Sequence, residues 1–208
     1  MKRIVLSLYI ILSTLYLKAG EQYIYTKISN QNGLTSTVNC IYKEKDGAVW
    51  LGTPRGLYSF NGYNIKHFND SLFIGRAVYD IEEDIKGGIW ILTDRWIMHR
   101  KKGEEIFKVV GCAEEKETPS FMSMCQDEEG LWFGGVGCIY RYTYNEEQLS
   151  YFCSLGNRYC SIINKAGRST LMSSSSNGSI LVNTMTGEVT DVLTDSPKEV
   201  SAVLTDSK

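Results

Sequence analysis

A tryptophan recurs three times in this chain of 208 residues, at a nearly constant interval and in a similar local sequence. Trp50, Trp90 and Trp132 are 40 and then 42 residues apart, and each follows a glycine by two or three residues. A repeat of about 40 residues, made of short apolar runs and glycine turns, is typical of a β-propeller blade. The repeat therefore predicts an all-β fold, a β-propeller of four-stranded antiparallel blades.

The first copy shows the repeat unit most clearly. Its four β-rich runs cover residues 38–43, 49–51, 57–60 and 63–68. The last two runs are joined by Asn61-Gly62, a strong hairpin signal because both residues tolerate positive φ. Gly47, Gly52 and Gly56 lie at or beside the other turns. We predict that these three glycines, like the three tryptophans, are structural residues of the repeat.

The pattern continues with falling similarity to the end of the chain. We expect blades at about residues 35–68, 77–110, 119–154 and 159–194, and the start of a fifth at about 199–208. In the fourth copy Thr170 takes the tryptophan position. Seven such blades would need on the order of 290 residues, so we expect an incomplete ring that is a fragment of a longer protein. An unusually small closed ring is the alternative.

The first 20 residues have the composition of a signal peptide. A basic start precedes an apolar run at residues 4–17, and the small residues Ala19 and Gly20 follow. The run is shorter than the roughly 18 to 20 residues that a helix needs to cross a bilayer, although an uncleaved anchor is the alternative. We therefore expect export to the periplasm, a partial propeller at residues 21–208, and no other membrane span.

Charge and cysteine content narrow the function further. The formal net charge is −2, and there is no basic stripe, so nucleic-acid binding is not expected. Of six cysteines, Cys40, Cys125 and Cys138 fall within apolar runs, which favours buried free thiols over a disulfide framework. No cysteine or histidine spacing indicates a metal site, and no cofactor is expected.

The entry to the first repeat resembles a known family. Asn32-Gly33 leads into residues 34–41, followed by the segments 46–53 and 56–62. Together they resemble the two-component regulator propeller repeat. In that family the repeat builds the periplasmic sensor region of hybrid two-component histidine kinases, many of them in polysaccharide-degrading gut bacteria. The resemblance implies an ectodomain that senses oligosaccharides, with an inner-membrane anchor and a kinase outside this chain.

No catalytic group can be recognised in the sequence. His67 and His99 lack an evident nucleophile or carboxylate partner, and we interpret both as ordinary strand histidines. The acidic runs 82–84 and 127–129 fall in turns between first and second strands, where a polar turn explains them without a calcium site. We interpret the repeated tryptophans as packing between blades. The prediction is a protein that is not an enzyme.

One propeller face carries the candidate ligand-binding residues. It is formed by the loops between second and third strands and by the connections between blades. The candidates are Arg55, Arg76, Asp94, Arg95, Trp96 and Arg158. Arginines and an exposed aromatic ring suit sugar hydroxyls or acidic sugar groups, although a solvated rim without a ligand explains them equally well.

We therefore interpret the chain as the N-terminal periplasmic sensor propeller of a hybrid two-component regulator. It would bind a ligand such as an oligosaccharide and relay the signal to a kinase outside this chain. Its expected protein partners are the remaining blades or a second copy of itself. The alternatives are a stand-alone exported propeller scaffold for protein interaction, and a propeller enzyme such as a polysaccharide lyase.

Overall fold

The structure is a computed structural model, described for residues 27–28, 33–45, 47–112, 120–175 and 178–192. The predicted signal peptide and the predicted start of a fifth blade lie outside these residues. Within the described ranges every regular element is a β-strand, so the all-β prediction is confirmed. The same ranges contain no helix long and apolar enough to cross a membrane.

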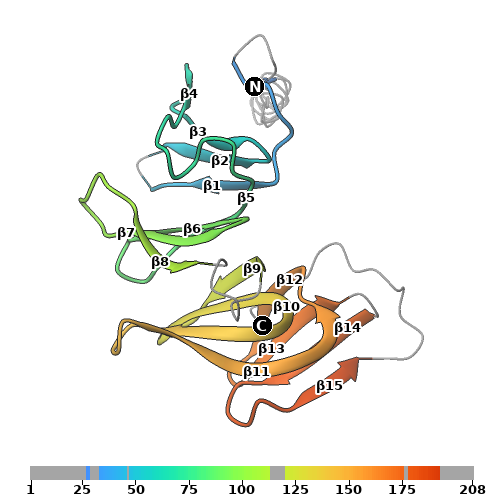
Figure 1. Cartoon of the computed structure of the whole chain (residues 1–208). Helices are drawn as coiled ribbons and strands as arrows, with labels where there is room; N and C mark the ends of the chain where they lie inside the picture. The colour runs from blue at the N-terminus through green and yellow to red at the C-terminus, as the bar shows by residue number, and fades with distance from the viewer. Residues whose placement is uncertain (1–26, 29–32, 46, 113–119, 176–177, 193–208) are drawn as a thin grey trace, which may run out of the picture.

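The strands form four antiparallel sheets, each built from consecutive strands (Figure 1). The first sheet contains β1 (Cys40–Lys43), β2 (Val49–Thr53), β3 (Gly56–Phe60) and β4 (Ile65–His67). The second contains β5 (Val78–Glu83), β6 (Ile89–Thr93), β7 (Trp96–Arg100) and β8 (Lys108–Cys112). The third contains β9 (Phe121–Gln126), β10 (Gly130–Thr143) and β11 (Gln148–Tyr159). The fourth contains β12 (Ile162–Gly167), β13 (Thr170–Ser175), β14 (Gly178–Asn183) and β15 (Val189–Val192).

The third sheet has three labelled strands, and its long strand β10 folds back on itself as a hairpin that takes the place of two strands of a blade. Its first half pairs with β9 and its second half with β11. The two ends of the hairpin meet where the Tyr144 N–H donates to the Glu129 carbonyl at 2.9 Å. Gly130 permits this approach, because a Cβ there would lie 1.8 Å from the Tyr142 carbonyl oxygen. The third unit is therefore a blade of the same kind as the others.

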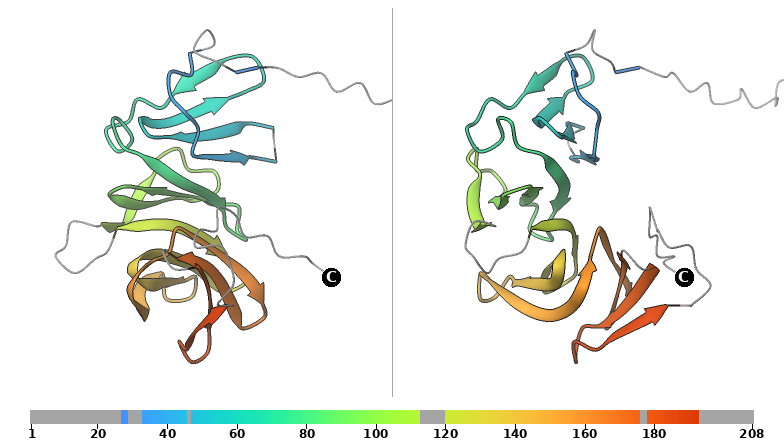
Figure 2. Two further views of the ribbon diagram at one scale, coloured as in Figure 1. Left: turned by 90° about the vertical axis from the view of Figure 1, so that its right-hand side faces the viewer. Right: turned by 45° about the vertical axis from the view of Figure 1, so that its right-hand side comes forward.

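The four sheets follow one another along an open arc, with the first and fourth at its two ends (Figure 2). The first strand of each sheet lies next to the first strand of the next: β1 beside β5, β5 beside β9, and β9 beside β12. This order is that of consecutive propeller blades around an axis. The predicted propeller architecture is confirmed.

Side chains connect these inner strands across each joint between sheets. Asn39 Nδ2 donates to the Val78 carbonyl at 2.9 Å, and Ser123 Oγ donates to the Cys160 carbonyl at 3.3 Å. Between the second and third sheets, the Met124 N–H donates to Asp80 Oδ2 at 3.0 Å. Each contact gives a hydrogen-bond partner to a backbone group at or beside an inner strand, as buried backbone groups require.

The three repeated tryptophans pack between neighbouring sheets. Trp50 joins a cluster with Val78 and Ile81 of the second sheet, and Trp90 joins one with the third sheet. Trp132, which is fully buried, contacts the cluster formed by the fourth sheet. The packing of the large indole rings is therefore a main source of cohesion between blades.

The tryptophan position of the fourth sheet is occupied by Leu171, and the assignment to Thr170 is wrong. Trp50 and Trp90 are the second residues of β2 and β6, and Leu171 is the second residue of β13. Leu171 is fully buried and lies in the same cluster as Trp132. The turn before it is short, with Gly167 paired to Thr170, and this shifts the register relative to the other copies.

Five cysteines are described with their side chains, and all five are free thiols: Cys40, Cys125, Cys138, Cys153 and Cys160. Four of them are buried, and Cys40 is half-buried. Burial raises the pKa of each thiol, so they behave as small apolar groups of the core.

Candidate ligand-binding site

Four of the six predicted ligand-binding residues come together at one end of the second sheet. Arg76 Nη1 lies 3.8 Å from Asp94 Oδ2. The guanidinium carbons of Arg76 and Arg95 lie 5.1 and 5.0 Å from the ring centroid of Trp96. The indole also packs against the core shared with the first sheet. The side chains of this cluster therefore contact one another, and Trp96 is not an open platform for a sugar.

The other two predicted residues lie apart from that cluster. Arg55 is exposed in the turn between β2 and β3, where its N–H donates to Thr53 Oγ1 at 3.1 Å. Arg158, near the end of β11, donates to Asp191 Oδ2 of β15 at 3.1 Å. Arg158 thus ties the third sheet to the fourth, and the structure does not gather the six residues into one site.

The opposite ends of the sheets carry a contact that the sequence interpretation missed. In each of the first three sheets, a carboxylate from the turn after the first strand accepts a hydrogen bond from the repeated indole. The pairs are Glu44 with Trp50 at 2.9 Å, Asp84 with Trp90 at 3.0 Å, and Asp127 with Trp132 at 2.7 Å. These acids belong to the turns that the sequence interpretation treated as merely polar.

A cationic or imidazole side chain completes each pair by covering the indole and bonding to the acid. Arg100 takes this role over Trp50, His99 over Trp90 and Arg141 over Trp132. The corresponding nitrogen-to-carboxylate distances are 2.8, 3.0 and 3.2 Å. We call this arrangement the acid–tryptophan clamp. Its signal in the sequence is an acid five or six residues before the tryptophan and, in two copies, a basic residue nine after it.

The clamps of the second and third sheets hold Asp84 and Asp127 in the ionised form. Burial by itself would raise the pKa of Asp84, but hydrogen bonds from His99, Gly88, Trp90 and Lys86 outweigh it and lower the pKa to about 2. Burial likewise opposes ionisation of Asp127, and the Trp132 and Glu129 hydrogen bonds with the Arg141 and Lys165 charges lower its pKa. Both acids are therefore fixed negative charges at neutral pH.

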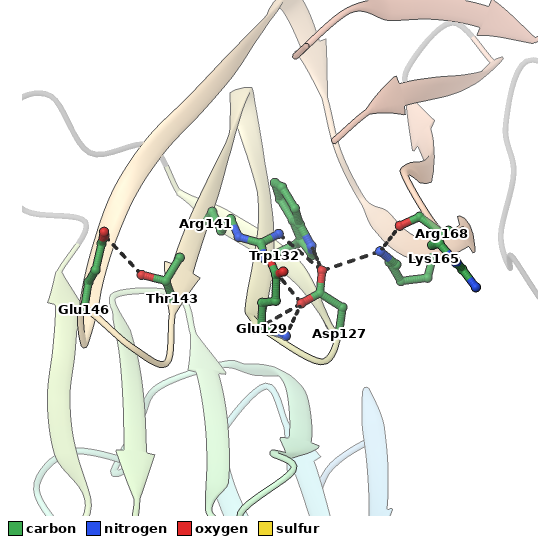
Figure 3. Close-up of polar contacts among 9 residues, drawn as sticks. Asp127, Glu129, Trp132, Arg141, Thr143, Glu146, Lys165 and Arg168 are labelled. Atoms are coloured by element: carbon green, nitrogen blue, oxygen red, sulfur yellow. Dashed lines mark hydrogen bonds and ion pairs between the residues drawn. The ribbon is translucent and has the colours of Figure 1, made fainter. Parts of the chain in front are cut away.

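A large cleft lies beside the third clamp, between the third and fourth sheets (Figure 3). Its volume is about 820 Å³. It is lined by Gln126, Asp127, Glu128, Glu129, Arg141, Lys165, Arg168, Ser169, Thr184 and Met185. A volume of this size lies within the roughly 300 to 1,000 Å³ of typical small-molecule sites.

Asp127 is the centre of the charged network in this cleft (Figure 3). Its carboxylate accepts hydrogen bonds from the N–H groups of Glu129 and Gly130 at 2.9 and 3.0 Å. Lys165 Nζ, from the first strand of the fourth sheet, lies 3.5 Å from Asp127 Oδ2 and donates to the Arg168 carbonyl at 3.1 Å. The network spans the joint between the two sheets and fixes the wall of the cleft.

Other polar groups in the cleft remain available to a ligand. Glu128 and Arg168 are exposed, and in Figure 3 the Arg168 guanidinium points away from Asp127. Gln126 Oε1 is buried and has no hydrogen-bond partner among the described residues. The hydroxyl-bearing residues Ser169 and Thr184 add groups that both donate and accept. The cleft therefore offers acceptors, donors and both signs of charge.

The cleft opens where the repeat departs most from its pattern. The fourth sheet has Leu171 in place of tryptophan, and its short turn at Gly167 carries no acid. That sheet therefore forms no clamp, and Lys165 reaches Asp127 of the neighbouring sheet instead. Places where a fold departs from its own local rules are often functional sites. In the described part of the chain, no group of three or more histidine, cysteine, aspartate or glutamate side chains is placed to hold a metal ion.

Comparison with known proteins identifies the repeat. Residues 32–55 match the family model described as two component regulator propeller. This match confirms the predicted resemblance. It covers the entry to the first sheet, including Gly47 and Trp50. No curated protein matches the sequence significantly.

Solved structures share the fold at low sequence identity. The extracellular domain of BT4673 from B. thetaiotaomicron, described as a one component system, has a TM-score of 0.69 at 15% identity, over 86% of this chain and 25% of that one. The extracellular domain of BT3049 from the same organism, described as a hybrid two component system, has a TM-score of 0.69 at 16% identity, over 83% and 27%. The chain thus spans about a quarter of these two ectodomains.

An enzyme shares the fold as well. Virginiamycin B lyase from Staphylococcus aureus has a TM-score of 0.64 at 16% identity, over 83% of this chain and 60% of the lyase. Because the fold occurs in both sensor ectodomains and an enzyme, the fold alone does not assign a function.

Proposed function

We propose that this chain is part of an extracytoplasmic sensor propeller of a hybrid two-component regulator, and that it binds an oligosaccharide in the cleft between the third and fourth sheets. Three things support the proposal: the family match in the first repeat, the fold shared with sensor ectodomains, and the polar lining of the cleft. The observation that carries the site is the fixed network around Asp127 at the edge of an 820 Å³ cleft.

The chemistry of the cleft suits sugar hydroxyls. Each hydroxyl both donates and accepts a hydrogen bond, and hydrogen bonds to charged groups are stronger than neutral ones. Glu128 supplies acceptors, Arg168 supplies donors, and Gln126 Oε1 is a buried acceptor without a partner. Asp127, Arg141 and Lys165 already bond to one another, so they fix the position of the wall before a ligand arrives.

The test uses the full chain and a panel of neutral and acidic oligosaccharides. Sugars that raise the thermal unfolding temperature are then titrated by calorimetry. We expect Glu128→Ala and Arg168→Ala each to weaken binding about tenfold, since each removes a charged hydrogen bond while leaving the Asp127 network in place. Arg55→Ala, an exposed arginine at the other end of the sheets, is the matched control and should bind as the wild type does.

The result that contradicts this site is equally specific. If a sugar binds but its affinity falls in Arg95→Ala and Trp96→Ala and not in Glu128→Ala or Arg168→Ala, the ligand occupies the cluster around Trp96. If no member of the panel binds, oligosaccharide recognition by this chain is wrong. Relay to a kinase outside this chain is the further part of the proposal, tested by sugar-dependent phosphorylation in the parent regulator and its Arg168→Ala variant.

A further inference from the structure

A second cleft lies between the second and third sheets and takes no part in the proposed sugar site. Its volume is about 250 Å³. Its lining includes Asp84, Lys86, His99, Lys102, Tyr142 and Tyr144. They come from β7, from β10 and from the turns at the clamp end of the two sheets, beside the acid–tryptophan clamp of the second sheet.

The floor of this cleft is aromatic and fixed. His99 stacks on Trp90 with ring centroids 4.2 Å apart and planes 16° apart. Tyr142 contacts the same indole edge-on, with centroids 4.6 Å apart. Asp84 holds the arrangement by accepting hydrogen bonds from both Trp90 and His99 at 3.0 Å. The floor is therefore preorganised for a flat apolar group.

The rim carries more positive than negative charge. Lys86 Nζ lies 5.6 Å from the Tyr144 ring centroid, and Lys101 Nζ lies 3.5 Å from Glu147 Oε1. Lys102 is exposed, and its ammonium has no hydrogen-bond or ion-pair partner among the described residues. The three lysines Lys86, Lys101 and Lys102 outnumber the two acids Asp84 and Glu147 among the lining residues, so the formal charge of the cleft is positive.

A buried hydroxyl adds a donor to the same cleft. Tyr144 is 9% exposed, and its buried hydroxyl meets the geometric criteria for a hydrogen bond with no other described residue. Burial and the charge of Asp84 raise the pKa of Tyr144 to about 12. The hydroxyl is therefore protonated at neutral pH and can donate to an anion.

We propose that this cleft is a binding site for a small organic anion that combines a carboxylate with a flat apolar body. The carboxylate is held by Lys102 and Lys86 at the rim and by the Tyr144 hydroxyl, and the flat body lies against His99 and Tyr142, which cover the fully buried indole of Trp90. Because its walls come from two sheets, a bound anion also ties the second sheet to the third.

Benzoate is the probe, and the full chain labelled with ¹⁵N is the sample. Binding is followed by the indole N–H resonances of the tryptophans. We expect benzoate to shift the Trp90 resonance in a saturable way and to leave Trp50 and Trp132 unchanged. Benzamide, which has the same shape without the charge, should bind about tenfold more weakly, because a hydrogen bond to a charged group is stronger than a neutral one.

Variants distinguish benzoate binding in this cleft from a general effect of the net charge. Lys102→Ala and Tyr144→Phe should each weaken benzoate binding about tenfold or less, and together by more. Lys66→Ala removes an exposed lysine from the first sheet and is the matched control. Arg168→Ala should also leave benzoate binding unchanged, which keeps this outcome independent of the sugar site.

Three outcomes overturn the proposal. The first is the absence of any saturable shift of the Trp90 resonance with benzoate. The second is equal binding of benzoate and benzamide, which leaves the lysines without a role. The third is an equal loss of affinity in Lys102→Ala and Lys66→Ala, which reduces the effect to net charge. The thermal unfolding midpoint of each variant without ligand shows whether it is folded.

Discussion

Arg100 Nη2 of the second sheet donates to Glu44 Oε1 of the first sheet at 2.8 Å. The same guanidinium lies 5.2 Å from the ring centroids of both Trp50 and Phe107. Both charged side chains are 20% exposed. One arginine therefore completes the clamp of the neighbouring blade, whereas the second and third sheets draw the corresponding residue from their own strands.

Arg100→Ala should loosen the joint between the first two sheets. It removes a mostly buried ion pair and two cation–π contacts, and we expect a loss of about 2 kcal/mol in the free energy of unfolding. Arg100→Lys keeps the charge but not the planar stacking group, so its loss should be smaller. Urea denaturation measures both. A change within about 0.5 kcal/mol for Arg100→Ala, as for an ordinary surface residue, would contradict this role.

Glu82 gives the protein an unusual dependence on pH. Burial, with a contribution from the charge of Asp80, raises the pKa of Glu82 from 4.5 to about 7 in the folded state. The folded state therefore holds a proton that the unfolded state releases, and stability falls as the pH rises from about 4.5 to 7. Glu82→Gln removes this pH-dependent contribution to the stability. We expect the variant to unfold at a higher temperature than the wild type at pH 8.

The control for Glu82→Gln is the same comparison at low pH. At pH 4 the wild-type carboxyl is protonated in both states, so the two proteins should unfold at closely similar temperatures. A variant that is less stable than the wild type at pH 8 would show that the Glu82 carboxylate makes a favourable contact in its charged form.

Asp84 has the opposite effect at acid pH. Its pKa is lowered from 3.8 to about 2 by four hydrogen bonds that outweigh burial. The stability that it contributes is complete above about pH 4 and is lost as the pH falls towards 2. Asp84→Asn should therefore be less stable than the wild type at pH 6, with the difference shrinking between pH 4 and pH 2. A difference that stays constant over this range would contradict the assignment.

The fold can be predicted from the sequence because the blade repeat consists of local signals. Turn glycines and a buried tryptophan recur at fixed spacing, and each signal acts within about 40 residues. The sequence pattern places the tryptophan position of the fourth copy at Thr170, one residue too early, because the turn before it is shorter and leucine replaces tryptophan.

The candidate site was harder to predict because it depends on contacts between blades. Lys165 and Asp127 are 38 residues apart in the chain, and nothing local indicates that the side chains meet. The predicted candidates share a suitable residue type and one face of the propeller, but the structure shows that the arginines beside Trp96 cover its ring. A site that forms by packing between two repeats is only weakly indicated by the sequence of either repeat.

Gly52 tests how closely the first two sheets approach each other. A Cβ at this position would lie 2.3 Å from Cys40 Sγ and 2.7 Å from Val78 Cγ1, and Val78 is fully buried at the start of the second sheet. Gly52→Ala should therefore cost about 1 to 3 kcal/mol, as overpacking of a core does. Gly167→Ala is the matched control, since a Cβ there meets nothing within 4 Å. Equal unfolding midpoints for the two variants in urea would show that the joint can widen without cost.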